Sequence, residues 1–294
     1  MRKVGLAVLA GMGLSLAVGG IGVAADMPVK MPAKVAAPNS WSGWYVGLNA
    51  GYLEPASSLV STDATIISPG TGTDPVEVAG VASGARSRIG KGNGGFIGGA
   101  QLGWNYLASP SLLIGIETDI QWSSLRESGS VTTIVPTNIP GQFWRTQITA
   151  SRSLDYLGTL RGRLGGIVTP SVLIYGTGGL AYGGANSSTS IFQAGFDPGG
   201  FPPAPSAIAG SSSGLRAGYT VGAGLEWMFA RNWNAKLEYL YYDLGSVTYA
   251  NGVLAQNVGP TNFSGGGIIT AASNSNTRFD GHVFRVGVNY MLGR

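Results

Sequence analysis

Eight segments of this sequence alternate apolar residues with glycine, polar or charged residues at a period of two. They are residues 44–52, 95–106, 112–122, 158–165, 172–183, 215–229, 235–244 and 284–292. Because the side chains of a β-strand point alternately to opposite faces, each segment predicts a strand with one apolar and one polar face. The connections between the segments alternate in length, at roughly 40, 5, 30, 5, 30, 5 and 40 residues. All short connections therefore fall on one side of an antiparallel meander, and all long ones fall on the other.

This pattern predicts an all-β fold: an eight-stranded antiparallel up-and-down transmembrane β-barrel with short periplasmic turns and long extracellular loops. The alternative is a soluble, lipocalin-like barrel, which would turn its apolar residues inward. The polar faces here carry mostly glycine, asparagine, glutamine and charged residues, which are too small and too polar to fill a dry core. Glycine accounts for 49 of the 294 residues and no sustained helical periodicity is present, so helix should be nearly absent.

The charged residues of the predicted strands share the polar face. In GTLRGRLG, residues 158–165, Arg161 and Arg163 lie opposite the face of Leu160 and Leu164. An arginine that faces lipid at the bilayer midplane costs about 2–4 kcal/mol, so the charged face should line the lumen. The predicted lumen set comprises five cations, Arg161, Arg163, Arg216, Lys236 and Arg285, and five anions, Glu117, Asp119, Asp155, Glu226 and Glu238. This balance favours a paired structural plug over a catalytic or ion-conducting carboxylate cluster.

Two pairings within this set are expected. Mirroring the sixth and seventh strands about Asn232 places Glu226 near Glu238, and Arg285 on the next strand is the candidate cation between them. For Arg161, the candidate partner is Glu117 or Asp119.

Aromatic residues gather at two levels of the predicted barrel. Trp41, Trp44, Trp104, Tyr106, Trp227, Phe229, Trp233 and Tyr290 fall at the short-turn end, whereas Tyr52, Phe96, Trp122, Tyr156, Tyr182, Tyr241 and Phe284 fall at the other. Two aromatic bands are typical of a protein that crosses two membrane interfaces.

The first 25 residues predict a secretory signal peptide. Arg2 and Lys3 precede an uncharged stretch that ends in the small residues Val23-Ala24-Ala25, and an uncleaved membrane helix is the alternative. Residues 26–43, which contain three prolines, predict a periplasmic lead-in, and the barrel domain should cover 44–292. Loss of Arg2 and Lys3 leaves a net charge of about +2, which gives no reason to expect nucleic-acid binding.

No enzyme or cofactor site is expected. The single histidine, His282, has Phe284 two residues along where a lipid-editing triad would need a serine, and it is a weak haem ligand by itself. The glycine-rich stretch GKGNGG at 90–95 neither follows a strand nor opens a helix, so it does not predict a phosphate cradle. The cations of the predicted loops could contact lipopolysaccharide phosphates; they are Arg86, Arg88, Lys91, Arg126, Arg145 and Arg152.

The final predicted strand has the pattern of an assembly signal for outer-membrane proteins. The pattern consists of Arg285, Gly287, Tyr290 and Leu292: a polar residue, then glycine, then an aromatic and an apolar residue two apart. The barrel-assembly machinery is the partner that would recognise this signal. Ordinary closure of the barrel accounts for the same alternation.

The ordered series of strand motifs resembles the small alphaproteobacterial outer-membrane immunogenic proteins, a porin-related family with an OmpA-like barrel. The series includes WSGWYVGLNAGY, GGFIGGAQLGWNY, GTLRGRLG and WNAKLEYLYYDLG, and it spans residues 41–292. The chain departs from the usual pattern in ending Met-Leu-Gly-Arg, without a terminal aromatic.

The resemblance implies an outer-membrane protein with a structural and surface-exposed role in the cell envelope. Its expected partners are outer-membrane lipid, lipopolysaccharide and, through its loops, host surface molecules. A narrow porin-like diffusion channel and a haem- or host-ligand-binding surface protein remain the alternatives.

Overall fold

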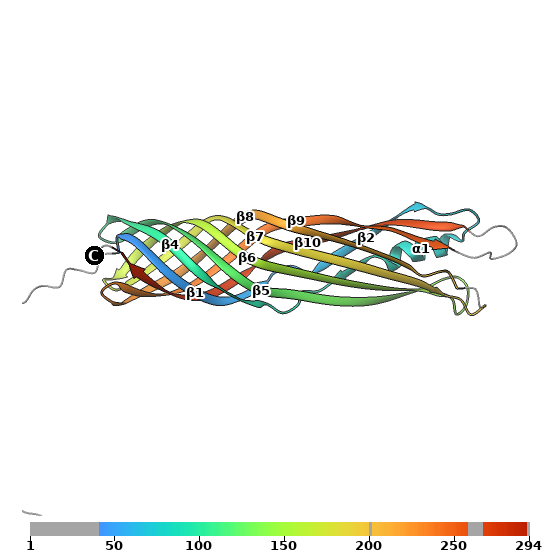
Figure 1. Cartoon of the computed structure of the whole chain (residues 1–294), viewed down its shortest axis with the longest axis horizontal. Coiled ribbons are helices and arrows are strands. Elements are labelled where there is room, and N and C mark those ends of the chain that lie inside the picture. Colours follow the sequence, from blue (N-terminus) through green and yellow to red (C-terminus); the bar gives the residue numbers. More distant parts are fainter. Residues whose placement is uncertain (1–40, 200–201, 258–266, 293–294) are drawn as a thin grey trace, which may run out of the picture. The chain divides into compact units, whose positions relative to one another are not determined.

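The computed structural model describes residues 41–199, 202–257 and 267–292 (Figure 1). The elements are β1 (Gly43–Pro55), β2 (Val60–Ser68), α1 (Pro75–Gly84), β3 (Ser87–Ile89), β4 (Gly95–Ser109), β5 (Leu112–Pro136), β6 (Phe143–Thr169), β7 (Val172–Phe196), β8 (Ser206–Ala230), β9 (Trp233–Asn257) and β10 (Ile268–Met291). The predicted signal peptide, and the lead-in as far as residue 40, lie outside the described residues. No helix in the described ranges has both the length and the hydropathy needed to cross a membrane.

Antiparallel strands form an up-and-down ring, as the sequence predicts. Each of β1, β4, β5, β6, β7, β8, β9 and β10 pairs with the next, and β10 pairs back onto β1 from Tyr45↔Met291 to Pro55↔Gly281. Two-residue turns at 110–111, 170–171 and 231–232 join β4–β5, β6–β7 and β8–β9. We call the end of the ring that holds these turns the short-turn end and the opposite end the far end.

Most of the residues predicted to form long loops are strand instead. Strands β5 to β9 each have 25 or 27 residues, and the connection between β5 and β6 is only 137–142. The expected loop lengths were therefore wrong for this part of the chain. The reason is that the period of two continues beyond the membrane-sized segments, with serine, threonine and alanine in place of large apolar residues.

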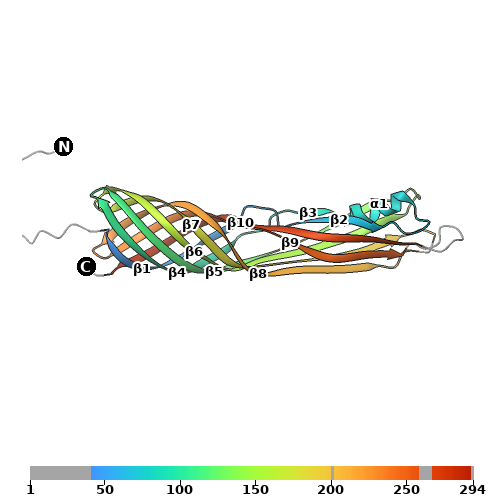
Figure 2. The ribbon, with the colours of Figure 1, turned by 90° about the horizontal axis from the view of Figure 1, so that it is seen from above.

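The first connection adds structure at the far end. Within it, β2 pairs with β10 from Ser61↔Asn276 to Ser68↔Thr270, and β3 pairs with β2 (Figure 2). Helix α1 begins at Pro75 after the cap Asp74, whose carboxylate accepts a hydrogen bond from the amide of Val76 at 2.7 Å. Gln193 of β7 donates to the carbonyl of Val81, so the helix is tied to the ring.

Large apolar side chains cover the outward surface of the ring between the two aromatic bands. Exposed fractions reach 70% for Leu48 and Trp122 and 75% for Phe96. Aromatic neighbours pack against each other at both levels, as for Trp233 with Tyr290 and Tyr52 with Phe96. The expectation that Trp41 belongs to the outward aromatic band was wrong. Trp41 is only 1% exposed and packs inside the ring.

Three apolar clusters fill the interior at successive levels. The short-turn cluster consists of Trp41, Leu113, Leu173, Tyr175 and Met228. The middle cluster consists of Leu53, Ile97, Leu125, Leu154, Leu157, Ala181, Ala185, Leu240, Tyr242, Leu244, Val247, Tyr249, Phe279 and Val283. The far cluster consists of Leu59, Val60, Ala64, Val81, Ala85, Ile89, Trp144, Ile148, Ala150, Ile191, Leu254, Ile269 and Ala271. Along β5, Glu117 and Asp119 come between Leu113 and Leu125, so the buried charges lie between the short-turn and middle clusters.

Candidate functional site: a charge network inside the ring

Eight of the ten predicted lumen residues form one buried network. They are Glu117 and Asp119 of β5, Arg161 and Arg163 of β6, Glu226 of β8, Lys236 and Glu238 of β9, and Arg285 of β10. None is more than 3% exposed. Strand register creates two of the contacts directly, because Glu117 faces Arg161 and Glu238 faces Arg285.

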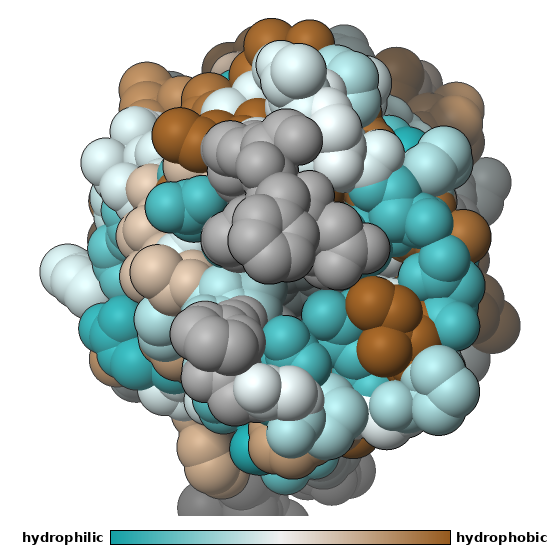
Figure 3. Space-filling view, turned by 90° about the vertical axis from the view of Figure 1, so that its right-hand side faces the viewer, coloured by the Kyte–Doolittle hydropathy of each residue, from teal (hydrophilic) through white to brown (hydrophobic). Residues whose placement is uncertain are grey.

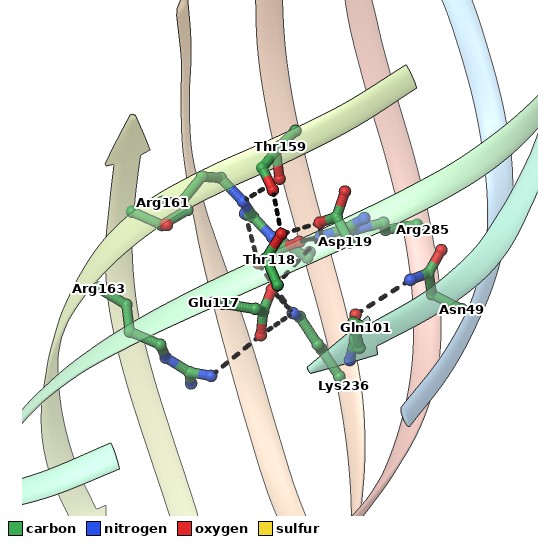
Figure 4. Close-up of polar contacts among 12 residues, drawn as sticks. Asn49, Gln101, Glu117, Thr118, Asp119, Thr159, Arg161, Arg163, Lys236 and Arg285 are labelled. Carbon is green, nitrogen blue, oxygen red and sulfur yellow. Dashed lines mark hydrogen bonds and ion pairs between the residues drawn. The ribbon is translucent and has the colours of Figure 1, made fainter. Parts of the chain in front are cut away.

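Arg161 lies at the centre of the network (Figure 4). Its guanidinium is 2.9 Å from Asp119 Oδ2 and 3.1 Å from Glu238 Oε1, and it also pairs with Glu117. The remaining donor, Nε, bonds to Thr159 Oγ1 at 2.9 Å. Every nitrogen of this guanidinium therefore has a partner, which is the condition for an arginine to be tolerated in a buried site.

Arg163 extends the network toward the short-turn end. It donates from Nη2 to Glu226 Oε1 at 2.6 Å and from Nη1 to the hydroxyl of Tyr45 at 2.6 Å. Its guanidinium carbon is 4.1 Å from the centroid of the Tyr175 ring, within range of a cation–π contact. The hydroxyl of Tyr175 in turn donates to Glu238 Oε1, so the short-turn cluster and the network share a side chain.

Lys236 and Arg285 are the remaining two cations of the network, and both pair with its carboxylates. Lys236 Nζ is 2.6 Å from Glu117 Oε1 and 3.2 Å from Glu238 Oε1, and Arg285 Nη2 is 2.9 Å from Asp119 Oδ2. Four cations thus meet four carboxylates, and the network carries no net charge.

The expected bridge between Glu226 and Glu238 is not present. Arg285 binds Glu238, but Glu226 binds Arg163 instead. The pairing obtained by mirroring the strands about Asn232 was therefore wrong by two residues. The turn lies at 231–232, and the register between β8 and β9 shifts between Met228 and Ala230. Glu226 therefore faces Lys236 and not Glu238.

Asp155 and Arg216 lie outside the network. At Asp155, β6 has one residue more than β7 between the pairs Leu154↔Ala185 and Tyr156↔Gly184. This β-bulge reverses the inward alternation, so Asp155 is half exposed and contacts Arg126 and Asn186 instead. Arg216 is half-buried, and it makes no ion pair with the acids in the described part of the chain.

A second buried ion pair lies closer to the far end, and sequence analysis missed it. Arg152 and Glu127 are both buried and are bonded at 2.7 Å. Arg152 also donates to the carbonyl oxygens of Ser57, Ser58 and Arg278, at 3.2, 3.3 and 2.6 Å. The expectation that Arg152 is a loop cation free to contact phosphates was therefore wrong. The inward alternation of Ile148, Ala150, Arg152 and Leu154 was the signal that could have placed it.

The predicted assembly residues occupy both sides of the last strand. The Arg285 side chain lies in the network, whereas Tyr290 faces outward and packs on Trp233 with ring centroids 5.0 Å apart. The amide of Leu292 donates to the carbonyl of Trp44 at 2.8 Å. His282 is hydrogen-bonded through Nδ1 to the hydroxyl of Tyr239 at 2.8 Å. His282 thus packs within the outward aromatic surface.

An antiparallel ring with apolar aromatic bands outside and paired charges inside defines an outer-membrane β-barrel protein. The sequence matches the outer membrane protein beta-barrel domain over residues 29–291, and the chain belongs to this family of outer-membrane proteins. It is 34% identical, over an alignment of 302 residues, to the 31 kDa outer-membrane immunogenic protein of Brucella melitensis biotype 1, and equally to that of Brucella suis biovar 1. Each alignment covers 99% of this chain and 99% of the relative.

Two solved bacterial structures that match this chain have low overall similarity to it. OprG from Pseudomonas aeruginosa is 12% identical with a TM-score of 0.34, and the match covers 85% of this chain and 97% of OprG. Ail, the attachment invasion locus protein of Yersinia pestis, is 9% identical with a TM-score of 0.27, and the match covers 83% of this chain and 99% of Ail.

Proposed function

We propose that this chain is an eight-stranded transmembrane barrel with a closed lumen, and that it serves the outer membrane as a structural, surface-exposed protein. In this proposal it is neither a diffusion channel nor an enzyme. The single observation that carries the proposal is the neutral network of eight buried charges, which joins five strands through the interior.

The filling of the interior on both sides of the network supports closure. An eight-stranded barrel has an interior just wide enough for side chains to fill. Trp41 and Tyr175 pack at the short-turn side of the network, and Leu157, Tyr242 and Leu240 pack at the other side, each no more than 3% exposed. An ion on this route would have to displace apolar side chains as well as separate paired charges.

The composition of the far end supports its placement outside the cell. Figure 3 looks onto this end, where hydrophilic and near-neutral side chains make up most of the described surface and hydrophobic ones form separate patches. The predicted signal peptide would leave the start of β1, and with it the short-turn end, on the periplasmic side. The far end would then form the surface that antibodies and host molecules meet, in keeping with the immunogenic relatives.

Thiol labelling on intact cells tests this orientation, since the sequence contains no cysteine. Asn138→Cys is at the exposed β5–β6 connection, and Ser111→Cys is at the exposed β4–β5 turn. A membrane-impermeant maleimide should label Asn138→Cys on whole cells and Ser111→Cys only after the outer membrane is opened. The reverse pattern would invert the topology. For closure, proteoliposomes holding the chain should not swell in isotonic pentose, and swelling would show an open path.

A further inference from the structure

Beyond the far aromatic band, the outward face of β5 to β8 carries small polar side chains in register. Ser128, Ser151, Ser188 and Ser211 face one another across the four strands, and the neighbouring row is Arg126, Ser153, Asn186 and Ser213. In the first row, the hydroxyl groups of Ser151 and Ser188 are hydrogen-bonded, with their Oγ atoms 2.8 Å apart. We call these two rows the serine face. A groove of about 380 Å³ runs along them.

A cluster with one acid and one cation marks the membrane side of the serine face. The side chain of Asn186 donates to Asp155 at 2.8 Å and to Ser153 at 3.3 Å, and Arg126 Nη1 is 3.5 Å from Asp155 Oδ1. The Arg126 and Asp155 side chains are 72% and 46% exposed, so both can reach a ligand. Because Arg126 and Asp155 neutralise each other, the cluster offers donors and acceptors without a net charge to select a phosphate.

The cluster lies just outside the hydrocarbon core of the membrane. Arg126 is four residues beyond Trp122, whose ring is 70% exposed in the far aromatic band. At about 3.3 Å per residue, this places Arg126 roughly 13 Å further along the strand than an interface residue. The serine face is therefore continuous with the lipid-facing surface and begins at the height of lipid headgroups.

Strand β9 borders the serine face on the other side of β8. The regular register between the two strands ends at Tyr219↔Asp243, but β9 stays beside β8 beyond that pair. A methyl group on Gly210 would collide with the carbonyl oxygen of Ala250, and the amide of Ala255 donates to Ser206 Oγ at 3.2 Å. The polar groups that the groove offers are therefore the side chains of the serine face.

We propose that the serine face binds neutral sugar residues of the core saccharide of lipopolysaccharide in the surrounding outer leaflet. The proposal rests on the outward orientation of the far end. A sugar presents many hydroxyl groups that both donate and accept, and the serine face presents the same mixture without large apolar groups and, since Asp155 neutralises Arg126, without a net charge. Continuity with the lipid-facing surface selects a ligand that is anchored in the same membrane. A glycolipid meets this requirement, because its acyl chains can lie on Leu180 and Leu215 below.

Hydrogen exchange on the refolded mature chain tests the proposal in three kinds of symmetric vesicle: phospholipid alone, phospholipid with lipid A, and phospholipid with a lipopolysaccharide that carries its core. Both leaflets of such vesicles are identical, so the result does not depend on the orientation in cells. We expect the outer parts of β7 and β8 to exchange about tenfold more slowly with the core-bearing lipid than with the other two. Asn186→Ala should abolish the slowing. Asn276→Ala, at an exposed asparagine of β10, should keep it.

Three results would overturn the proposal. Equal slowing by lipid A and by the core-bearing lipid would assign the contact to phosphates or acyl chains. No slowing with either lipid would show that the serine face does not bind the glycolipid. Slowing of residues 206–214 that grows with the density of the chain and needs no glycolipid would assign the contact to a second copy of the chain.

Discussion

Arg161 of β6 and Glu238 of β9 lie on strands three places apart in the ring, yet Nη1 and Oε1 of these residues are 3.1 Å apart. The two side chains therefore meet across the interior instead of along one wall. Arg161 also pairs with Glu117 and Asp119 of the adjacent strand, so one guanidinium joins two separated parts of the ring. Removing it should weaken the barrel as a whole.

Arg161→Ala should lower the free energy of unfolding by about 3–5 kcal/mol, because it leaves four buried carboxylates with three cations. The double variant Arg161→Ala/Asp119→Asn restores neutrality and should recover at least about 1 kcal/mol of this loss. Urea unfolding from lipid vesicles, followed by tryptophan fluorescence, measures both changes.

Arg216→Ala is the matched control, since Arg216 is a half-buried arginine outside the network. It should change the unfolding free energy by no more than about 0.5 kcal/mol. Equal losses for Arg161→Ala and the double variant would show that the charges are not coupled.

Arg152→Ala should loosen the first connection while leaving the membrane part of the ring folded. Arg152 holds the carbonyl oxygens of Ser57 and Ser58, and its loss would leave Glu127 buried without a cation. Limited proteolysis of the folded barrel should then cut near residues 56–59 at least tenfold faster than in the wild type. Arg145→Ala, at an exposed arginine of the same strand, should cut at the wild-type rate. Equal cleavage rates for the wild type and both variants would show that Arg152 does not hold the first connection in place.

The membrane-level strands could be predicted because their two faces differ so strongly. In β6, Leu160 and Leu164 face outward while Arg161 and Arg163 face inward, and this contrast identifies both the strand and its lumen face. At the far end, both faces of the strands carry serine, threonine and alanine, as in β7 around Ser187 and Ser188. Such a stretch has the composition of a loop, so its pairing cannot be read from residue types alone.

The members of the network could be predicted more readily than their partners. A single β-bulge at Asp155 reverses the alternation of β6, and nothing in the local residues marks its position. The pairing of Glu226 with Arg163 depends on a register shift near Met228 and on contacts across the ring. The buried role of Arg152 likewise depends on the backbone of β10 and of the first connection, which are distant in sequence.

Glu77 should make the stability of α1 depend on pH. Burial raises the pKa of this carboxyl group above its ordinary value of 4.5. The folded state therefore binds this proton more tightly than the unfolded state does. The stabilisation that results is complete below pH 4.5 and is lost as the pH rises through the raised pKa. Glu77→Gln should protect the amides of α1 more than the wild type does at pH 7, by about 1 kcal/mol or less, and the difference should vanish below 4.5. Hydrogen exchange measures this, and lower protection in the variant at pH 7 would contradict it.

Tyr290→Leu separates an assembly signal from simple closure of the ring. Tyr290 is exposed on the outward surface, so leucine should cost about 1 kcal/mol or less in the folded barrel. If the assembly machinery reads this strand, the variant should reach the outer membrane in severely reduced yield while refolding into detergent as well as the wild type. Tyr219→Leu, at another outward tyrosine, is the control and should assemble normally. A normal yield of heat-modifiable Tyr290→Leu barrel from cells would show that this strand closes the ring and is not an assembly signal.

The closed lumen is the central claim, and single-channel recording in planar lipid bilayers tests it most directly. The purified mature chain should give no steady open level across a range of voltages, at protein amounts where a large porin inserted in parallel gives regular steps. Rare, brief and irregular events are compatible with fluctuations of a filled interior. Reproducible steps of one size with long open times would mean that water and ions pass Arg161 and its partners, and the closed barrel would then be wrong.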